Sequence, residues 1–153
     1  MGFESIKSKG GFIAIQLSES GKEASILGQR GKLRNMLSGF ILLDDHLYTS
    51  TYREGEWLCL NALTGETVHS WKGGYGTISN ADNRFYIMSN MGTAVLCEGS
   101  MDGFKTMSLC KLDIHPYYPF MLLWSTPVIK NKRLYIRHKG SLFSYDIAAE
   151  IIE

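Results

Sequence analysis

Proline, cysteine and long apolar runs are scarce in this sequence, and neither sign of charge is in excess. The three cysteines, Cys59, Cys97 and Cys110, are odd in number and form no CxxC pair. We therefore expect neither a disulfide framework nor a cysteine-based metal site. No apolar run approaches the roughly 20 residues that a membrane-spanning helix needs, so no such span is predicted.

The balance of charge excludes one large class of partner. Lys and Arg number 16 and Asp and Glu number 15, which gives a net charge of +1. A basic surface that would attract nucleic acid or an anionic membrane is therefore not expected. Residues 1–6 show no basic region followed by an apolar stretch, so no signal peptide is predicted there.

The residues that are present favour β-structure. Apolar residues make up 44% and charged residues 20% of the 153 residues, which is enough for a packed core. Tyr, Phe and Trp number 8, 7 and 3, and flat side chains of this kind pack well on the pleated face of a sheet. Glycine is common, with 16 residues, and indicates many turns.

A short motif occurs three times along the chain. Each copy contains a polar turn, a large apolar residue and a tyrosine, and the copies occupy residues 43–48, 81–86 and 130–135. Tyr48 and Tyr86 are 38 residues apart, whereas Tyr86 and Tyr135 are 49 apart. A glycine-containing turn and a second apolar segment follow each tyrosine. A unit of about 38 residues with four short strands is typical of one blade of a β-propeller.

These patterns predict an all-β fold. Strands are expected at residues 12–17, 40–43, 46–52, 56–61, 84–89, 93–98, 133–138 and 141–146, and no segment has sustained helical periodicity. The predicted architecture is a partial β-propeller of about three four-stranded antiparallel blades. Its parts are the end of one blade (12–38), two blades (39–73 and 74–112), an inserted loop (113–122) and a last blade (123–153).

The inserted loop is the candidate interaction site. Pro116 and Pro119 interrupt the strand pattern between the second and third copies of the motif. Insertions in repeat proteins lie on one face, and aromatic residues and Met are enriched in interfaces. The candidate interaction residues are His115, Tyr117, Tyr118, Phe120 and Met121. The alternative is that the loop only caps the neighbouring blade.

The last unit carries a resemblance to a known family. Residues 124–146 contain a Trp, the sequence Ser-Thr-Pro-Val, a turn, an apolar-Tyr strand, a Gly and a strand that ends in Asp146. This pattern resembles the PQQ-like β-propeller repeat of quinoproteins and outer-membrane assembly lipoproteins. Residues 58–66 resemble its second half, with Asn61 where Asp is usual. Trp71 lies six residues after Gly65, later than in the family pattern, which indicates a bulge in that outer strand.

The resemblance also implies a ring of six to eight blades. We therefore expect the chain to be the C-terminal part of a larger propeller, located in the periplasm or at the cell envelope. An incomplete ring exposes apolar faces at its open blade ends, so we expect the chain to dimerise or aggregate, and a homodimer through these ends is the simplest closed arrangement. Tyr48, Tyr86 and Tyr135 are expected to pack between blades, and Cys59 and Cys97 are expected to be buried.

Quinoprotein dehydrogenases that share such repeats hold PQQ and Ca²⁺ with adjacent cysteines and a Glu/Asn/Asp cluster. In this chain no two cysteines are adjacent, and the acidic pair Asp44 and Asp45 fits a hairpin turn. No catalytic, cofactor-binding or metal-binding residue is therefore assigned. The four histidines are scattered and are expected to be solvated or in turns; they are His46, His69, His115 and His138.

The repeat occurs in enzymes and in scaffolds, so two functions are weighed. We predict a non-catalytic scaffold, without a cofactor, that binds a protein or a small ligand. The alternative is a fragment of a PQQ-dependent oxidoreductase whose catalytic residues lie in other blades.

Overall fold

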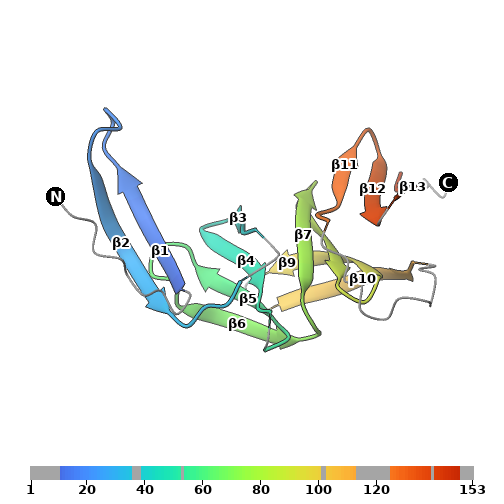
Figure 1. Cartoon of the computed structure of the whole chain (residues 1–153), viewed down its shortest axis with the longest axis horizontal. Coiled ribbons are helices and arrows are strands. Elements are labelled where there is room, and N and C mark those ends of the chain that lie inside the picture. Colours follow the sequence, from blue (N-terminus) through green and yellow to red (C-terminus); the bar gives the residue numbers. More distant parts are fainter. Residues whose placement is uncertain are drawn as a thin grey trace.

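The computed structural model describes residues 11–35, 39–52, 54–100, 103–112, 125–138 and 140–148, which form thirteen β-strands and no helix. The strands form four antiparallel sheets that follow one another along the chain (Figure 1). This arrangement confirms the predicted all-β partial propeller. Two of the blades have four strands, one has three, and one is represented by a hairpin.

Each sheet is a simple meander of consecutive strands. The β1–β2 hairpin consists of β1 (Gly11–Leu17) and β2 (Ala24–Gly31). The first full sheet consists of β3 (Ile41–Leu43), β4 (His46–Ser50), β5 (Glu56–Asn61) and β6 (Thr67–Lys72). The second full sheet consists of β7 (Gly76–Ala81), β8 (Arg84–Ser89), β9 (Thr93–Ser100) and β10 (Gly103–Lys111). The last sheet consists of β11 (Val128–Lys130), β12 (Arg133–His138) and β13 (Ser141–Asp146).

The polar turn of the repeated motif has the same geometry in all three copies. It joins the first strand to the second strand of each sheet, and both of its central residues have positive φ angles between 47° and 59°. The pairs are Asp44 and Asp45, Asp82 and Asn83, and Asn131 and Lys132. Two consecutive positive φ angles define the type I′ turn, which matches the twist of the flanking strands and favours Asn and Asp. The hairpin-turn interpretation of Asp44 and Asp45 is therefore confirmed.

A bulge occurs in the outer strand of three sheets. The register between β5 and β6 shifts so that Cys59 pairs with His69 and Leu60 with Thr67, which leaves Val68 unpaired. This is the bulge that the position of Trp71 indicated. Equivalent shifts leave Leu27 in β2 and Met107 in β10 unpaired. The bulges make β1 and β2 the equivalents of the third and fourth strands of a blade.

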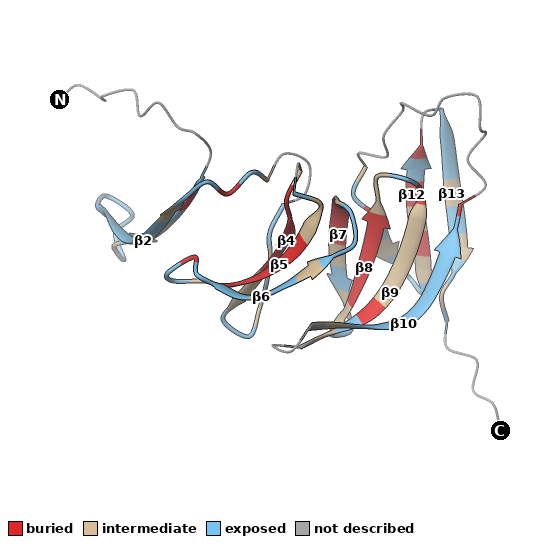
Figure 2. Ribbon diagram, turned by 90° about the horizontal axis from the view of Figure 1, so that it is seen from below, coloured by how far each residue is buried: buried red, intermediate tan, exposed pale blue. Residues whose placement is uncertain are grey.

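Three apolar cores lie between successive sheets, as in a propeller. The core between the two full sheets is rich in aromatic residues, and the ring of Tyr48 lies 4.6 Å from that of Phe85. The core between the second full sheet and the last sheet contains Met88 and Ile136. A smaller core joins the hairpin, through Phe12, to the first full sheet. Buried residues gather on β4, β5, β7 and β8, whereas β10 and β13 are more exposed (Figure 2).

Hydroxyl groups on the inner strands also connect neighbouring sheets. The Ser50 hydroxyl donates to the Gly76 carbonyl at 2.9 Å, and the Thr77 hydroxyl donates to the Ser125 carbonyl at 3.0 Å. Both side chains are buried. Since a buried polar group is costly without a partner, these bonds fix how one sheet follows the next.

The repeated tyrosine lies on the same face of its sheet in all three units, but its burial differs among the three copies. Tyr48 and Tyr86 are buried in the cores that join their sheets to the next sheet. Tyr135 is only half-buried, and the expectation that it packs between blades is wrong for this copy. Leu134 and Ile136, on the opposite face of β12, are the residues that contact the second full sheet. Within the described ranges, no sheet stacks on the face that carries Tyr135.

Candidate functional site

The predicted interaction loop lies outside the described residues. Residues 113–124 contain all five of its members, which are His115, Tyr117, Tyr118, Phe120 and Met121, and they also contain Trp124. The described sheets form further surfaces that are able to bind a partner. Three surfaces stand out: a cleft between two sheets and the two end faces of the arc.

The cleft lies between the second full sheet and the last sheet and has a volume of about 250 Å³. Its walls are mainly apolar and include Leu96 on β9, Leu134 on β12 and Ile147 after β13. The lining residues come from β8, β9 and β10 of the second full sheet and from β12 and β13 of the last sheet. Ser108 and Cys110 on β10 also line the cleft.

Tyr145 on β13 faces Cys110 across this cleft. Burial raises the pKa of the Tyr145 hydroxyl, and the nearby Cys110 thiol raises it further. Cys110 is exposed, in contrast to the other two cysteines. The Tyr145 hydroxyl therefore stays protonated and uncharged near neutral pH, which suits an apolar cleft.

The buried cysteines serve the core, as expected. Cys59 and Cys97 have no exposed surface, and all three cysteines are free thiols. Burial raises the pKa of Cys97 to about 12 and also raises that of Cys59. Tyr48, next to Cys59, has its pKa raised to about 12 by burial and by the neighbouring thiol. None of these groups is activated for chemistry.

The histidines show one departure from the expectations. His138 is buried on the core face of β12, in the same alternation as Leu134 and Ile136, so the expectation that it is solvated or in a turn is wrong. His46 agrees with the expectation, because it lies at the first type I′ turn, where its Nδ1 atom is 2.6 Å from the Asp44 carbonyl oxygen. His69 packs its ring against Trp71, whose own ring lies 4.4 Å from Phe104 at the junction of the full sheets.

The donor set does not fit PQQ with Ca²⁺. Among the described residues, no group of three or more His, Cys, Asp or Glu side chains converges. Asp44 and Asp45 are constrained in a turn, and Cys59, Cys97 and Cys110 are far apart in sequence and differ in exposure. Since a calcium site needs six to eight oxygen ligands, these residues do not form a calcium site of that kind.

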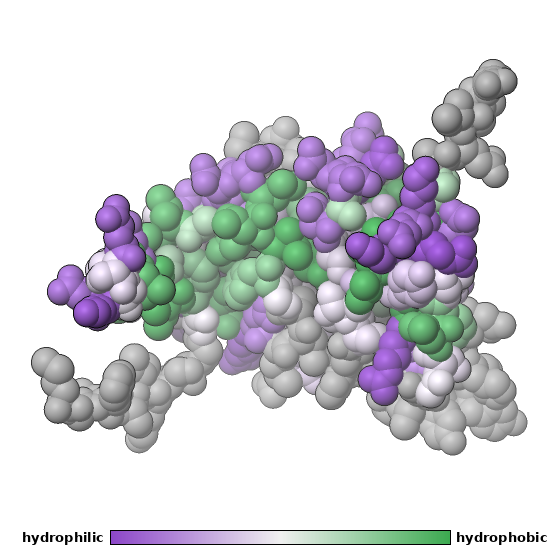
Figure 3. Space-filling model, turned by 90° about the horizontal axis from the view of Figure 1, so that it is seen from above, coloured by the Kyte–Doolittle hydropathy of each residue, from purple (hydrophilic) through white to green (hydrophobic). Residues whose placement is uncertain are grey.

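The two end faces of the arc carry exposed apolar side chains. Of the fourteen exposed large apolar residues among those described, five lie on the β1–β2 hairpin and two on the last sheet. The hairpin residues are Ile13, Ile15, Leu17, Ile26 and Leu27, and the last-sheet residues are Val128 and Leu142. A hydrophobic area extends from the hairpin toward the middle of the molecule (Figure 3). Half of the exposed large apolar residues among those described thus lie on the first and last sheets of the arc.

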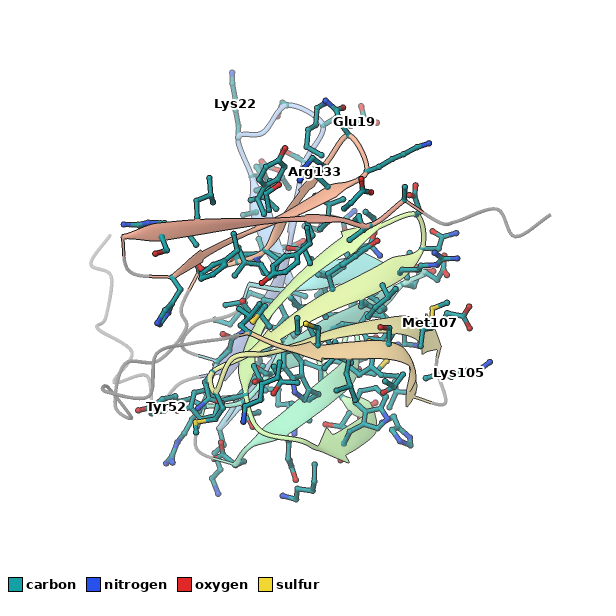
Figure 4. The ribbon with its side chains drawn as sticks, turned by 90° about the vertical axis from the view of Figure 1, so that its right-hand side faces the viewer. Glu19, Lys22, Tyr52, Lys105, Met107 and Arg133 are labelled. Atoms are coloured by element: carbon teal, nitrogen blue, oxygen red, sulfur yellow. The ribbon has the colours of Figure 1, made fainter. Side chains whose placement is uncertain are left out.

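The register of the strands defines each end face. On the hairpin, Ile15 pairs with Ile26 on the side opposite Phe12, which packs on the first full sheet. On the last sheet, Val128 pairs with Tyr135 on the side opposite Leu134. Three cations share that face, and one of them is Arg133, which is labelled in Figure 4. The Arg133 Nη1 atom lies 3.9 Å from the Asp146 Oδ2 atom. The other two are Lys130 and Arg137.

The stacked four-stranded meanders, joined through cores between their faces, define the class of structure as an arc of a β-propeller. Comparison with solved structures agrees with this class. The chain is similar to BamB from Moraxella catarrhalis, with a TM-score of 0.66 and 16% sequence identity. The likeness covers 87% of this chain and 43% of that chain, so the chain spans less than half the length of the structure it matches. No family model and no curated protein sequence matches the chain.

The described part of the chain contains no helix with the length and hydrophobicity to cross a membrane.

Proposed function

We propose that this chain is a non-catalytic β-propeller scaffold that binds protein through its uncovered surfaces. The observation that carries the proposal is the gathering of exposed apolar side chains on the two end faces of the arc. Apolar patches of this kind on a soluble protein mark sites of interaction. The buried thiols and tyrosines, with raised pKa values, supply packing and no reactive group.

The scaffold acts in the periplasm or at the cell envelope. This part of the proposal depends on the resemblance of residues 124–146 to the PQQ-like repeat and on the structural likeness to BamB. A second copy of the chain is one protein that the end faces could bind, and the predicted homodimer belongs to this proposal. The loop at residues 113–122 remains the proposed second surface.

A binding experiment separates the scaffold from the quinoprotein alternative. PQQ is added to the protein together with an equimolar amount of Ca²⁺. Two signals are then measured: the intrinsic tryptophan fluorescence, and the reduction of a dye in the presence of alcohols or aldoses. The scaffold predicts no saturable quenching at micromolar PQQ and no dye reduction. Saturable quenching that requires Ca²⁺, or turnover that disappears without PQQ, would overturn the proposal.

A further inference from the structure

A pocket of about 490 Å³ lies at the junction of the two full sheets. One wall comes from the first full sheet, where Trp57 on β5 and Trp71 on β6 are paired residues. Thr93 on β9 and Thr106 on β10 line the pocket from the second full sheet. We call this space the junction pocket. Its volume is typical of small-molecule sites, which measure roughly 300–1,000 Å³.

Aromatic rings form much of the apolar surface of the junction pocket. The Phe104 ring lies 4.4 Å from the Trp71 ring and 6.3 Å from the Trp57 ring, so rings of both sheets meet in one cluster. The strands β6 and β10, which carry Trp71 and Phe104, contact each other at this junction (Figure 1). Such rings offer flat apolar surfaces, on which a ligand with a flat apolar face can pack.

The indole N–H of Trp57 is a buried donor that has no hydrogen-bond partner within the described ranges. Trp57 is only 5% exposed. Its Cδ1 atom, which is bonded to the indole nitrogen, lies 3.8 Å from the position that a Cβ atom would take on Gly73. Gly73 also lines the pocket, so the N–H edge of the ring faces the same opening. Since buried polar groups are normally hydrogen-bonded, an acceptor that enters the pocket would satisfy this donor.

Three more polar side chains line the junction pocket, and in the described part of the chain they have no hydrogen-bond partner either. They are Asn90, Thr93 and Thr106. The backbone that carries two of them is fixed, because the Asn90 N–H donates to the Tyr75 carbonyl at 2.9 Å and the Thr93 N–H donates to the Ser89 hydroxyl at 3.0 Å. An amide or a hydroxyl side chain both donates and accepts, so these groups suit a ligand that does the same.

Glycine keeps the mouth of the junction pocket open. Gly73 is exposed and its φ angle is not positive, so the backbone conformation does not require glycine there. Packing does not require it either, because the nearest atom to its Cβ position is the Trp57 Cδ1 atom at 3.8 Å. A larger side chain at this position would extend toward Trp57 and narrow the opening. Such a glycine allows close approach of a ligand to the backbone.

We propose that the junction pocket binds a neutral saccharide. One sugar ring packs its C–H face on the tryptophan wall, and its hydroxyl groups bond to Trp57, Asn90 and the two threonines. A sugar ring combines a flat apolar face with an edge of hydroxyl groups that donate and accept, which is the combination that the pocket presents. Binding without oxidation of the sugar is proposed. The inference goes beyond the scaffold function and does not depend on it.

Other classes of small ligand fit the junction pocket less well. A purely apolar ligand would leave the Trp57 N–H and the Asn90 amide without partners, and each unpaired group costs the free energy of its lost hydration. An anionic ligand would meet a cation that is already paired, because the Lys72 Nζ atom lies 2.5 Å from the Glu56 Oε1 atom. Among the described residues that line the pocket, Lys72 is the only charged one.

The test measures the side-chain N–H signals of Trp57, Trp71 and Asn90 by NMR in isotope-labelled protein. The probes are glucose, galactose, N-acetylglucosamine, maltose and cellobiose, each added alone at millimolar concentrations. At least one sugar should shift the signals of all three residues in a saturable manner. The dissociation constant should be on the order of 1 mM, which is typical of a ligand of this size in an open pocket. Exchange of the Trp57 indole proton with solvent should slow when the sugar binds.

Two variants remove the site in different ways. Asn90→Ala deletes a side chain that makes no hydrogen bond in the described structure, and Gly73→Leu fills the mouth of the pocket. Each should raise the dissociation constant about tenfold, because a hydrogen bond or access to the rings is lost. Gly39→Leu is the matched control: Gly39 is also exposed, has nothing within 4 Å of its Cβ position and does not line the pocket. It should keep the wild-type affinity.

Three results would overturn the proposal. The first is that no sugar shifts these signals, and the second is that the shifts persist unchanged in Asn90→Ala and Gly73→Leu. The third is tighter binding of a different probe at the same signals. Cyclohexanol is the probe for a merely apolar pocket, and a proline-rich peptide is the probe for a groove that docks protein. Failure of the sugars leaves the scaffold function intact, because that function depends on the end faces of the arc.

Discussion

A tyrosine at one position of the repeat shows how a residue's contribution depends on its neighbours. Tyr48 is 3% exposed and contacts Phe85 and Phe104, whereas Tyr135, at the same position of the last unit, is half-buried on an end face. The local sequence around the two residues is similar. Their difference arises from whether another sheet stacks on their face.

We predict that Tyr48→Ala destabilises the protein more than Tyr135→Ala. Loss of a buried aromatic ring costs about 3–5 kcal/mol, because transfer energy and packing are lost together. Truncation of the half-buried Tyr135 should cost about 1 kcal/mol in the monomer. Urea denaturation of both variants, compared at concentrations at which the chain is monomeric, measures the difference. Equal losses would show that the face with Tyr135 is covered in solution.

Glycine is required where the core closes on the backbone. A Cβ atom on Gly99 in β9 would overlap the ring of Phe85, which is fully buried and cannot move away. We predict that Gly99→Ala destabilises the protein by about 1–3 kcal/mol through overpacking. Gly31→Ala is the matched control, because nothing lies within 4 Å of its Cβ position, and it should change stability by less than about 1 kcal/mol. Thermal unfolding of both variants tests this, and a neutral Gly99→Ala would contradict the described packing of Phe85.

At the scale of the elements, the hairpin differs from the full sheets. A pair of strands is marginally stable alone, so β1 and β2 depend on their contacts with the first full sheet. Phe12 and Leu33 provide the apolar part of this contact. Arg30 provides the polar part, because its Nη1 donates to the Gly65 carbonyl at 3.1 Å and to the Thr67 hydroxyl at 2.6 Å.

Removal of the Arg30 guanidinium should loosen the hairpin selectively. In Arg30→Ala we expect the amides of β1 and β2 to exchange with deuterium several-fold faster, while those of β5 and β8 are unchanged. Lys22→Ala at the exposed tip of the hairpin serves as the control and should leave both groups unchanged. Faster exchange throughout the chain would show that the hairpin and the sheets unfold as one unit.

The sequence predicted the central strands of the sheets better than the strands at their edges. All eight predicted strands are present, and the ends of several match within one residue, as for β5, β8, β12 and β13. Five strands were not predicted, namely β2, β6, β7, β10 and β11. Three of these are outer strands with a bulge at Leu27, Val68 or Met107. A bulge breaks the alternation of apolar and polar residues on which the prediction depends.

At the scale of the whole molecule, the core between the two full sheets links stability to pH. Burial raises the pKa of Cys97 to about 12 from 9.0, and burial with the nearby Cys59 raises that of Tyr48 to about 12 from 10.0. Both groups are neutral when protonated, and the folded state holds the proton more tightly than the unfolded state. Their contribution to stability is therefore complete below pH 9 and is lost as the pH rises from 9 to 12.

We predict that the free energy of unfolding falls above pH 9 and that Cys97→Ala falls less steeply. The difference between wild type and variant should amount to roughly 2 kcal/mol between pH 9 and pH 11, since the unfolded thiol ionises in this range and the folded one does not. Denaturant titrations at fixed ionic strength measure it. Cys110→Ala, which removes an exposed thiol, is the control and should keep the wild-type dependence of the unfolding free energy on pH. If the curves for wild type and Cys97→Ala are parallel, the Cys97 thiol is not buried in solution.

The sequence by itself determined the local geometry and its repetition. The type I′ turns follow from the Asp and Asn pairs, the strands follow from the alternation around Tyr48 and Tyr86, and burial of Cys59 and Cys97 follows from the apolar segments around them. Only the tertiary structure decided which faces of the repeat are covered. Alternation along a strand shows which residues share a face, but contacts between distant sheets decide which face meets a neighbour. This is why His138 is buried while Tyr135 is half-exposed. The cleft beside Cys110 also depends on the tertiary structure, because residues of two sheets that are distant in sequence line it.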